Sequence, residues 1–199
     1  MTTQPGVLRA DARRNRERIL AAAVRAFSEK GADVPIDTIA KAAGVGSATL
    51  YRHFPTREAL VEAAYRNELA RFCDSAAGLL ADNPPDRALR LWMDRFIDYL
   101  AAKHGMADAL RAAVATGADP FSETLDKLST AISTLLRAGT DAGLLRSDVG
   151  PLDVGFSLAG IALVTSAPDQ RDRAGRLLDL LLDGLRHSPS GANRTRSDH

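Results

Sequence analysis

The 199-residue chain is 45% hydrophobic and 26% charged, which is enough apolar material for one or two domains with their own cores. Charged residues interrupt its apolar runs well before the roughly 18 residues of a membrane span, and the N-terminal stretch lacks the apolar segment of a secretion signal. The single cysteine, Cys73, excludes an internal disulfide and a cysteine zinc cluster. We therefore expect a cytoplasmic protein with no membrane partner, no metal and no cofactor.

Charge is distributed unevenly along the chain. Residues 1–60 contain ten Lys/Arg and six Asp/Glu, whereas the remainder contains sixteen and nineteen. A basic N-terminal part on a mildly acidic body favours a polyanionic partner at that end.

The sequence predicts an all-α fold. Ala, Leu and Arg dominate, period-two alternation is absent, and Gly and Pro punctuate the chain into about nine helices. Residues 1–10 and 188–199 are polar and lack apolar periodicity, so we expect a disordered arm and a disordered tail. Between them we place an N-terminal domain over 11–55 and a larger helical domain over 56–187.

The N-terminal domain has the layout of a helix-turn-helix. A first helix over 11–30 ends at Gly31, and a short helix over 36–43 is followed by Gly44, which supplies the positive φ of a tight turn. A helix over 47–53 comes next. Thr56 is placed to cap a fourth helix that runs to about residue 81.

The helix over 47–53 has two distinct sides. Leu50 and Phe54 lie about 40° apart on a helical wheel and define the buried side. Ala48, Thr49 and Arg52 point away from it, and Tyr51 and His53 flank it. This arrangement suits a helix in a DNA major groove, with outward residues at base edges and flanking polar aromatics at phosphates. An ordinary solvated helix face is the alternative.

Two further basic features bear on the same surface. Arg57, in the first turn of the fourth helix, is positioned to hold a phosphate together with the free backbone N–H groups there. The basic arm comprises Arg9, Arg13, Arg14, Arg16 and Arg18. It either enters a minor groove or forms the solvated start of the first helix.

The residues that suggest DNA binding also carry a family resemblance. The segments "ILAAAVRAFSEKG" and "IDTIAKAAGVGSATLYRHFPTREALVEAAY" resemble the N-terminal domain of TetR-family transcriptional regulators, over about residues 14–65. The resemblance implies that positions 47–49 and 52 face bases and that Tyr51, His53 and Arg57 touch the DNA backbone. The complete DNA-binding set is thus Ser47, Ala48, Thr49, Tyr51, Arg52, His53 and Arg57.

Four positions qualify this expectation. Gly46 stands where the family commonly has a serine cap, at a cost of only a few tenths of a kcal/mol. Ser47 and Ala48 replace a commoner Lys-Gly pair. Asp37, on the preceding helix, would be repelled by phosphate, which argues against strong base reading by that helix.

The resemblance further implies that the larger domain holds a small-molecule effector pocket. An aromatic stripe over 85–104 and neighbouring apolar residues are the candidates for its lining. An aromatic stripe at helical spacing is equally typical of a plain core. The candidate ligand-binding residues are Phe72, Trp92, Phe96, Tyr99, Met106 and Leu110.

Two apolar helices near the C-terminus predict a homodimer. Residues 152–166 are apolar nearly all round, and a helix over about 169–187 is rich in leucine. A surface helix needs only one apolar stripe, so we expect both helices to pack against their twofold copies as a four-helix interface. Burial within one protomer is the alternative. The expected interface residues are Phe156, Leu163, Leu177, Leu178, Leu181 and Leu185.

No catalytic motif is present, so we do not expect an enzyme. "GFSLA" at 155–159 departs from the nucleophile elbow by an alanine, and "GVG" at 44–46 lacks the lysine and strand of a phosphate loop. We expect a homodimeric regulator that binds double-stranded operator DNA, more often a repressor, and leaves a palindromic operator when a small-molecule effector binds. A helix-turn-helix protein without an effector, with the C-terminal half only a dimerisation module, is the alternative.

Overall fold

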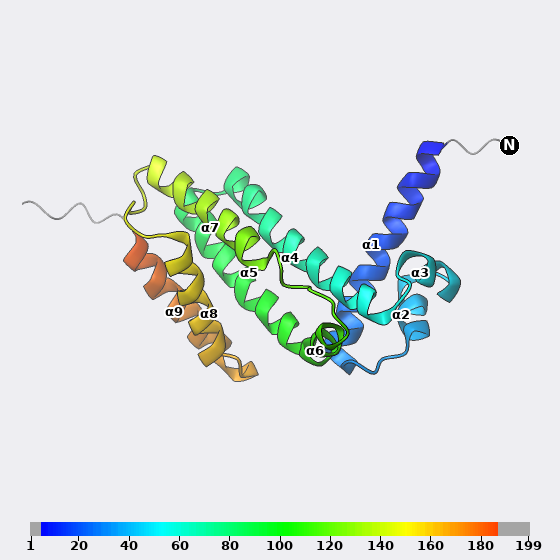
Figure 1. Ribbon diagram of the computed structural model, residues 1–199. Helices are drawn as coiled ribbons and strands as arrows, with labels where there is room; N and C mark the ends of the chain where they lie inside the picture. Colours follow the sequence, from blue (N-terminus) through cyan, green and yellow to red (C-terminus); the bar gives the residue numbers. More distant parts are fainter. Residues whose placement is uncertain (1–4, 187–199) are drawn as a thin grey trace, which may run out of the picture. The chain divides into compact units, whose positions relative to one another are not determined.

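The computed structural model of the protein describes residues 5–186, which form nine α-helices and one short 3-10 helix, with no β-strand in that range (Figure 1). The prediction of an all-α fold with about nine helices is therefore confirmed. The elements are α1 (Pro5–Lys30), α2 (Ile36–Ala43), α3 (Ser47–His53), α4 (Arg57–Asp82), α5 (Pro85–Gly105), α6 (Ala107–Ala115), α7 (Thr124–Asp141), α8 (Pro151–Val164), η1 (Pro168–Gln170) and α9 (Arg171–Leu185).

The chain forms two compact units. Unit 1 contains the residues up to Cys73 together with Asp98–Lys127, and unit 2 contains Asp74–Ile97 together with the residues from Leu128 onward. The helices α4, α5 and α7 thus contribute a part of their length to each unit.

Unit 1 is built around the three N-terminal helices. Helix α1 buries Ile19, Leu20 and Phe27, and α2 packs against α1 while α3 packs against α2 (Figure 1). The end of α5 closes on α1, because a Cβ at Gly105 would lie only 2.9 Å from the Cα of Ser28. Glycine is therefore needed at position 105 for this close approach.

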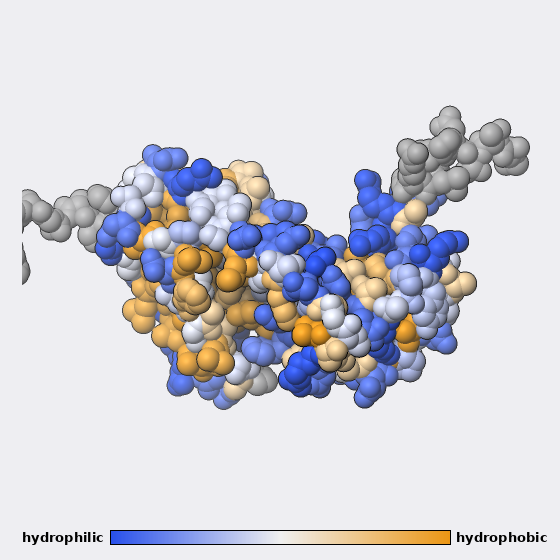
Figure 2. All heavy atoms as spheres, in the orientation of Figure 1, coloured by the Kyte–Doolittle hydropathy of each residue, from blue (hydrophilic) through white to orange (hydrophobic). Residues whose placement is uncertain are grey.

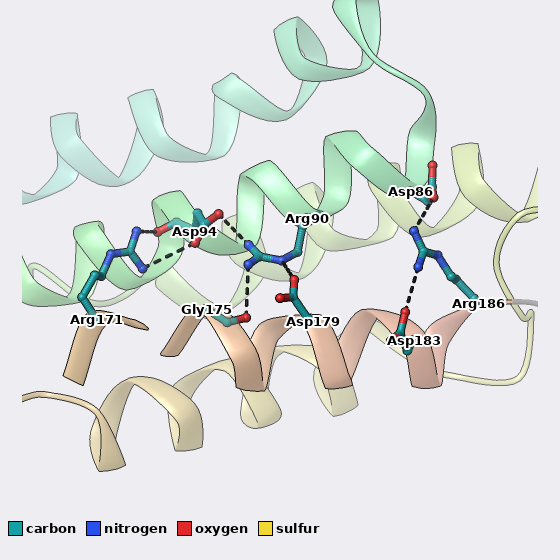
Figure 3. A network of polar contacts seen from close by, with 8 residues as sticks. All are labelled: Asp86, Arg90, Asp94, Arg171, Gly175, Asp179, Asp183 and Arg186. Carbon is teal, nitrogen blue, oxygen red and sulfur yellow. Dashed lines mark hydrogen bonds and ion pairs between the residues drawn. The ribbon is translucent and has the colours of Figure 1, made fainter. Parts of the chain in front are cut away.

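Unit 2 buries Trp92 of α5, Ile132 of α7 and Leu158 of α8, and places α8 beside α9. A polar network joins α5 to α9 (Figure 3). Arg90 donates hydrogen bonds to Asp94 at 2.5 Å, Asp179 at 2.6 Å and the carbonyl of Gly175 at 3.1 Å. Burial lowers the pKa of Arg90, but its hydrogen bonds and the two carboxylates outweigh that effect and raise it above its ordinary value. Arg90 therefore stays charged at every physiological pH.

Two helix boundaries differ from the predicted ones. Helix α1 begins at Pro5 rather than near residue 11, so the expected arm over 1–10 is helical from Pro5 onward. Proline is well tolerated at a first helical position, where its missing N–H would have no partner. Helix α9 begins at Arg171, after η1, rather than near residue 169. Residues 1–4 and 187–199, which include the predicted tail, lie outside the described residues.

Candidate DNA-binding surface

The turn between α2 and α3 is fixed by backbone hydrogen bonds. Gly44 adopts a left-handed conformation with φ 66° and ψ 37°. Its N–H donates to the carbonyl of Lys41, and the N–H of Val45 donates to that of Ala40, both at 3.0 Å. This pair is the Schellman arrangement that ends a helix at a glycine. Gly46 then caps α3 in an extended conformation, so the predicted bounds of both helices are confirmed.

Helix α1 supports this turn directly. The Nη2 of Arg18 donates a hydrogen bond to the carbonyl of Gly44 at 3.3 Å. This arginine thus holds the turn of the helix-turn-helix. Sequence reasoning treated Arg18 only as part of a basic arm, because a contact across 26 positions leaves no periodic signal.

The two sides of α3 agree with the helical wheel. Leu50 and Phe54 are 1% and 3% exposed and anchor the helix in unit 1, whereas Tyr51 is 48% exposed. Ala48 and Arg52 are also exposed. The remaining predicted base- or phosphate-facing residues of α3, which are Ser47, Thr49 and His53, are half-buried.

Asp37 of α2 has a defined partner on α3. The hydroxyl of Ser47 donates a hydrogen bond to Oδ1 of Asp37 at 2.6 Å. Because the hydroxyl proton is used in this bond, the remaining lone pairs of the Ser47 oxygen are left as acceptors. Asp37 therefore sets the hydrogen-bonding character of Ser47, a role that sequence analysis missed when it considered only phosphate repulsion.

Arg57 differs from its predicted role. Its two terminal nitrogens donate to the carbonyls of Ala32 and Val34, and its guanidinium lies 5.6 Å from the ring centroid of Phe27. These contacts fasten the start of α4 to the loop between α1 and α2. Arg57 thus has a structural role that the sequence did not reveal, and its contact with a DNA phosphate stays a prediction. The cap of α4 is as predicted, with the N–H of Ala59 donating to Oγ1 of Thr56 at 3.1 Å.

The residues proposed to line an effector pocket are all buried. Phe72, Tyr99, Met106 and Leu110 belong to unit 1, whereas Trp92 and Phe96 belong to unit 2. In unit 1 the ring of Phe72 stacks on that of Tyr99, with centroids 5.0 Å apart and planes 6° apart. In unit 2 the Trp92 and Phe96 rings lie 6.1 Å apart.

Sequence analysis missed two members of the unit 1 cluster. Tyr99 donates a hydrogen bond to the hydroxyl of Tyr65 at 2.9 Å, and Tyr65 and Thr124 share another at 3.1 Å. Burial, then the bond to Tyr65, raises the pKa of Tyr99 far above its ordinary value, so its phenol stays protonated. Tyr65 is seven positions before Phe72 and therefore lies on the same face of α4, so the sequence spacing could have predicted that Tyr65 joins this cluster. No spacing in the sequence pointed to Thr124.

The six predicted dimer residues are exposed, half-buried or buried, two of each. Phe156 and Leu163 of α8 are each 69% exposed, and Leu177 and Leu181 of α9 are half-buried. Leu178 and Leu185 are 0% and 3% exposed, so the prediction is wrong for these two. They lie on the stripe that α9 buries within its own protomer, together with Ala174 and Leu182.

Exposed apolar residues gather on α8 and α9. Val164 of α8 and Leu180 of α9 are 68% and 67% exposed and join Phe156 and Leu163 in this patch. Figure 2 shows hydrophobic surface over these two helices. No helix among the described residues is long and apolar enough to cross a bilayer.

Comparison with known proteins agrees with this geometry. Residues 19–64 match the family described as bacterial regulatory proteins, tetR family, and residues 84–187 match the C-terminal domain described as transcriptional regulator SbtR-like. The chain is also 27% identical over 148 residues to the HTH-type transcriptional regulator EthR of Mycolicibacterium smegmatis, covering 70% of this chain and 67% of that protein.

Two solved structures are similar over most of the chain. The TetR transcriptional regulator SCO0520 from Streptomyces coelicolor is 60% identical with a TM-score of 0.83, covering 87% of this chain and 99% of that one. A TetR regulatory protein from Mycobacterium vanbaalenii is 36% identical with a TM-score of 0.75, covering 90% and 99%. Together with the helix-turn-helix geometry, these matches establish that the chain belongs to the TetR family of DNA-binding transcriptional regulators.

Proposed function

We propose that this regulator binds a palindromic operator as a homodimer, with one α3 helix of each protomer in a major groove. The observation that carries the proposal is the outer face of α3, where Ala48 and Arg52 are exposed opposite the buried Leu50 and Phe54, and Tyr51 is exposed on one flank. In this proposal Arg52 pairs with a guanine and Ala48 meets a thymine methyl group. Ser47 and Thr49 contact neighbouring base edges. Tyr51 and His53 reach phosphates, which position the helix without specifying sequence.

The proposed dimer rests on the exposed apolar residues of α8 and α9. Contiguous apolar surface of this kind usually marks an interaction site, and a twofold contact places the same surface of both protomers face to face. Leu177 and Leu181, which are half-buried, complete the predicted set beside Phe156 and Leu163. Two α3 helices about one DNA turn apart, roughly 34–36 Å, would then match two operator half-sites.

Repression with release by an effector is the proposed mode of regulation. A ligand weakens operator binding only if it prefers a conformation that binds DNA less well. The hydroxyl group of Tyr99 and the stacked ring of Phe72 are the proposed contacts in unit 1. Such a set favours a ligand with an aromatic or apolar body and a hydrogen-bonding group.

A regulator without an effector is the second candidate. The observation that favours it is the burial of all six predicted pocket residues, with Trp92 at 0% and Phe96 at 3% exposed. These side chains would then form a core, and the C-terminal helices would serve dimerisation alone.

Selection of bound duplexes from a random DNA library tests operator recognition. We expect the wild-type protein to select a palindrome with half-sites about one turn apart. Arg52→Ala should relax one base position in each half-site at a cost of about 1–3 kcal/mol. Arg137→Ala, which removes an exposed arginine of α7, is the matched control and should select the wild-type sequence. Binding that is salt-sensitive but sequence-blind would overturn the proposal.

Thermal unfolding in the presence of a library of small apolar and aromatic compounds separates the two modes of regulation. An effector at 100 times its Kd should stabilise the folded protein by about 2.7 kcal/mol through mass action. It should also weaken operator binding, and Tyr99→Phe should reduce both effects. A ligand that raises the Tm without changing operator affinity is not an inducer, and a library without any hit favours the second candidate.

A further inference from the structure

A polar groove lies between α1 and α4 in unit 1, apart from both the α3 surface and the aromatic cluster. Its volume is about 420 Å³, within the range of small-molecule sites. Arginine, asparagine, glutamate and alanine side chains line it. Its six lining residues are Arg16, Ala59, Glu62, Ala63, Arg66 and Asn67.

The first charged group of the groove is not neutralised. Arg16 of α1 is exposed, and its guanidinium lies 5.3 Å from the ring centroid of Phe54. Among the described residues it has neither a hydrogen bond nor an ion pair, although its neighbour Arg13 pairs with Glu17. A cation over an aromatic face keeps all its N–H donors for another partner.

The second charged group of the groove, the guanidinium of Arg66, is held in place, but not all of its N–H donors have hydrogen-bond partners. The Nη2 of Arg66 pairs with Glu62 at 2.9 Å and donates to the carbonyl of Asp119 at 2.8 Å. Its Nε is buried and lacks a hydrogen-bond partner among the described residues. Buried N–H groups without partners are uncommon in folded proteins.

Donors therefore outnumber acceptors in the groove. Glu62 is its one carboxylate and is already paired with Arg66. Asn67 adds an amide for which no partner occurs in the described part of the chain. Two guanidinium groups and an amide facing one neutralised carboxylate form a surface that attracts and hydrogen-bonds an oxyanion, and the small alanine side chains leave room for a short apolar body.

We propose that this groove, between Arg16 and Arg66, is a binding site for a small oxyanion, a carboxylate or a phosphate. The same chemistry has two sources, which are a free metabolite and a phosphate of the DNA backbone. The site is additional to the proposed effector cluster and does not depend on it. Because Arg16 also covers Phe54 at the end of α3, an anion bound here acts next to the DNA-binding helix.

Calorimetric titration of the full-length protein with inorganic phosphate and with succinate, against chloride at equal ionic strength, tests the proposal. If the site serves a free anion, we expect saturable binding of at least one of the two probes. Arg16→Ala should weaken it at least about tenfold, as the loss of a charge-assisted hydrogen bond requires. Arg13→Ala removes an exposed arginine of the same helix and should bind like the wild type. Arg66→Lys keeps the positive charge but loses the planar guanidinium group with its paired N–H donors. It should therefore weaken anion binding while preserving the fold.

A second arm identifies the source of the oxyanion. If the site serves a free anion, Arg16→Ala loses phosphate or succinate binding and retains its affinity for duplex DNA. If it serves the DNA backbone, free anions bind weakly or not at all, and Arg16→Ala weakens duplex binding for every sequence and reduces its salt dependence by about one counterion. Wild-type behaviour of Arg16→Ala in both arms overturns the proposal.

Discussion

At the scale of single residues, the bond from Ser47 to Asp37 determines which hydrogen-bonding groups Ser47 would offer to a base in the proposed complex. Because Ser47 donates its proton to Asp37, its oxygen presents acceptors, which suit the amino groups of adenine or cytosine. We expect Asp37→Ala to reduce the preference at one operator position about three- to tenfold. It should also strengthen sequence-blind binding, since a negative charge is removed. Binding to operator variants measures both effects. Asp33→Ala removes a nearby exposed carboxylate and should change only the sequence-blind affinity. An unchanged base preference in Asp37→Ala contradicts this assignment.

At the scale of the helices, Arg90 holds α5 against α9 in unit 2 (Figure 3). Only 19% of its side chain is exposed, and it contacts Asp94, Asp179 and a backbone carbonyl. Removing it leaves two carboxylates close together without their shared cation. We therefore expect Arg90→Ala to lower the free energy of unfolding by about 1–3 kcal/mol, measured by urea denaturation. Arg137→Ala removes an exposed arginine without such partners and should stay within about 0.5 kcal/mol of the wild type. Equal stability of the two variants would show that the ion pairs of Arg171 with Asp94 and of Arg186 with Asp86 suffice to join α5 and α9.

At the scale of the whole molecule, the proposed operator recognition requires two protomers, because each carries one α3 helix. Phe156 and Leu163 of α8 are the most exposed apolar residues of the proposed interface. Replacing both with arginine places two charges at its centre, so we expect dissociation to monomers and loss of at least about 100-fold in operator affinity. Sedimentation equilibrium and operator titration measure the two effects. Leu125→Arg alters an equally exposed leucine of α7, 65% exposed, and should remain dimeric. If the double variant Phe156→Arg, Leu163→Arg remains dimeric, the dimer interface does not lie at these two residues.

The sequence by itself determined the local architecture of the DNA-binding part. The bounds of α2 and α3, the left-handed Gly44 and the cap at Thr56 were all predicted and are all found. Each of these features depends on residues within a few positions of one another, such as a glycine that tolerates positive φ or a threonine that caps a helix. The same short-range pattern also carried the resemblance to the TetR family.

Only the tertiary structure decided which side chains remain available for function. Arg57 was considered only for a phosphate contact, yet its two terminal nitrogens also donate to two carbonyls on the loop after α1. Leu178 and Leu185 were expected at a dimer interface, yet their own protomer buries them while Leu180 is exposed. In each case the partner is distant in sequence. Composition and periodicity show that a side chain needs a partner or an apolar neighbour, but the packing of other elements determines which partner it has.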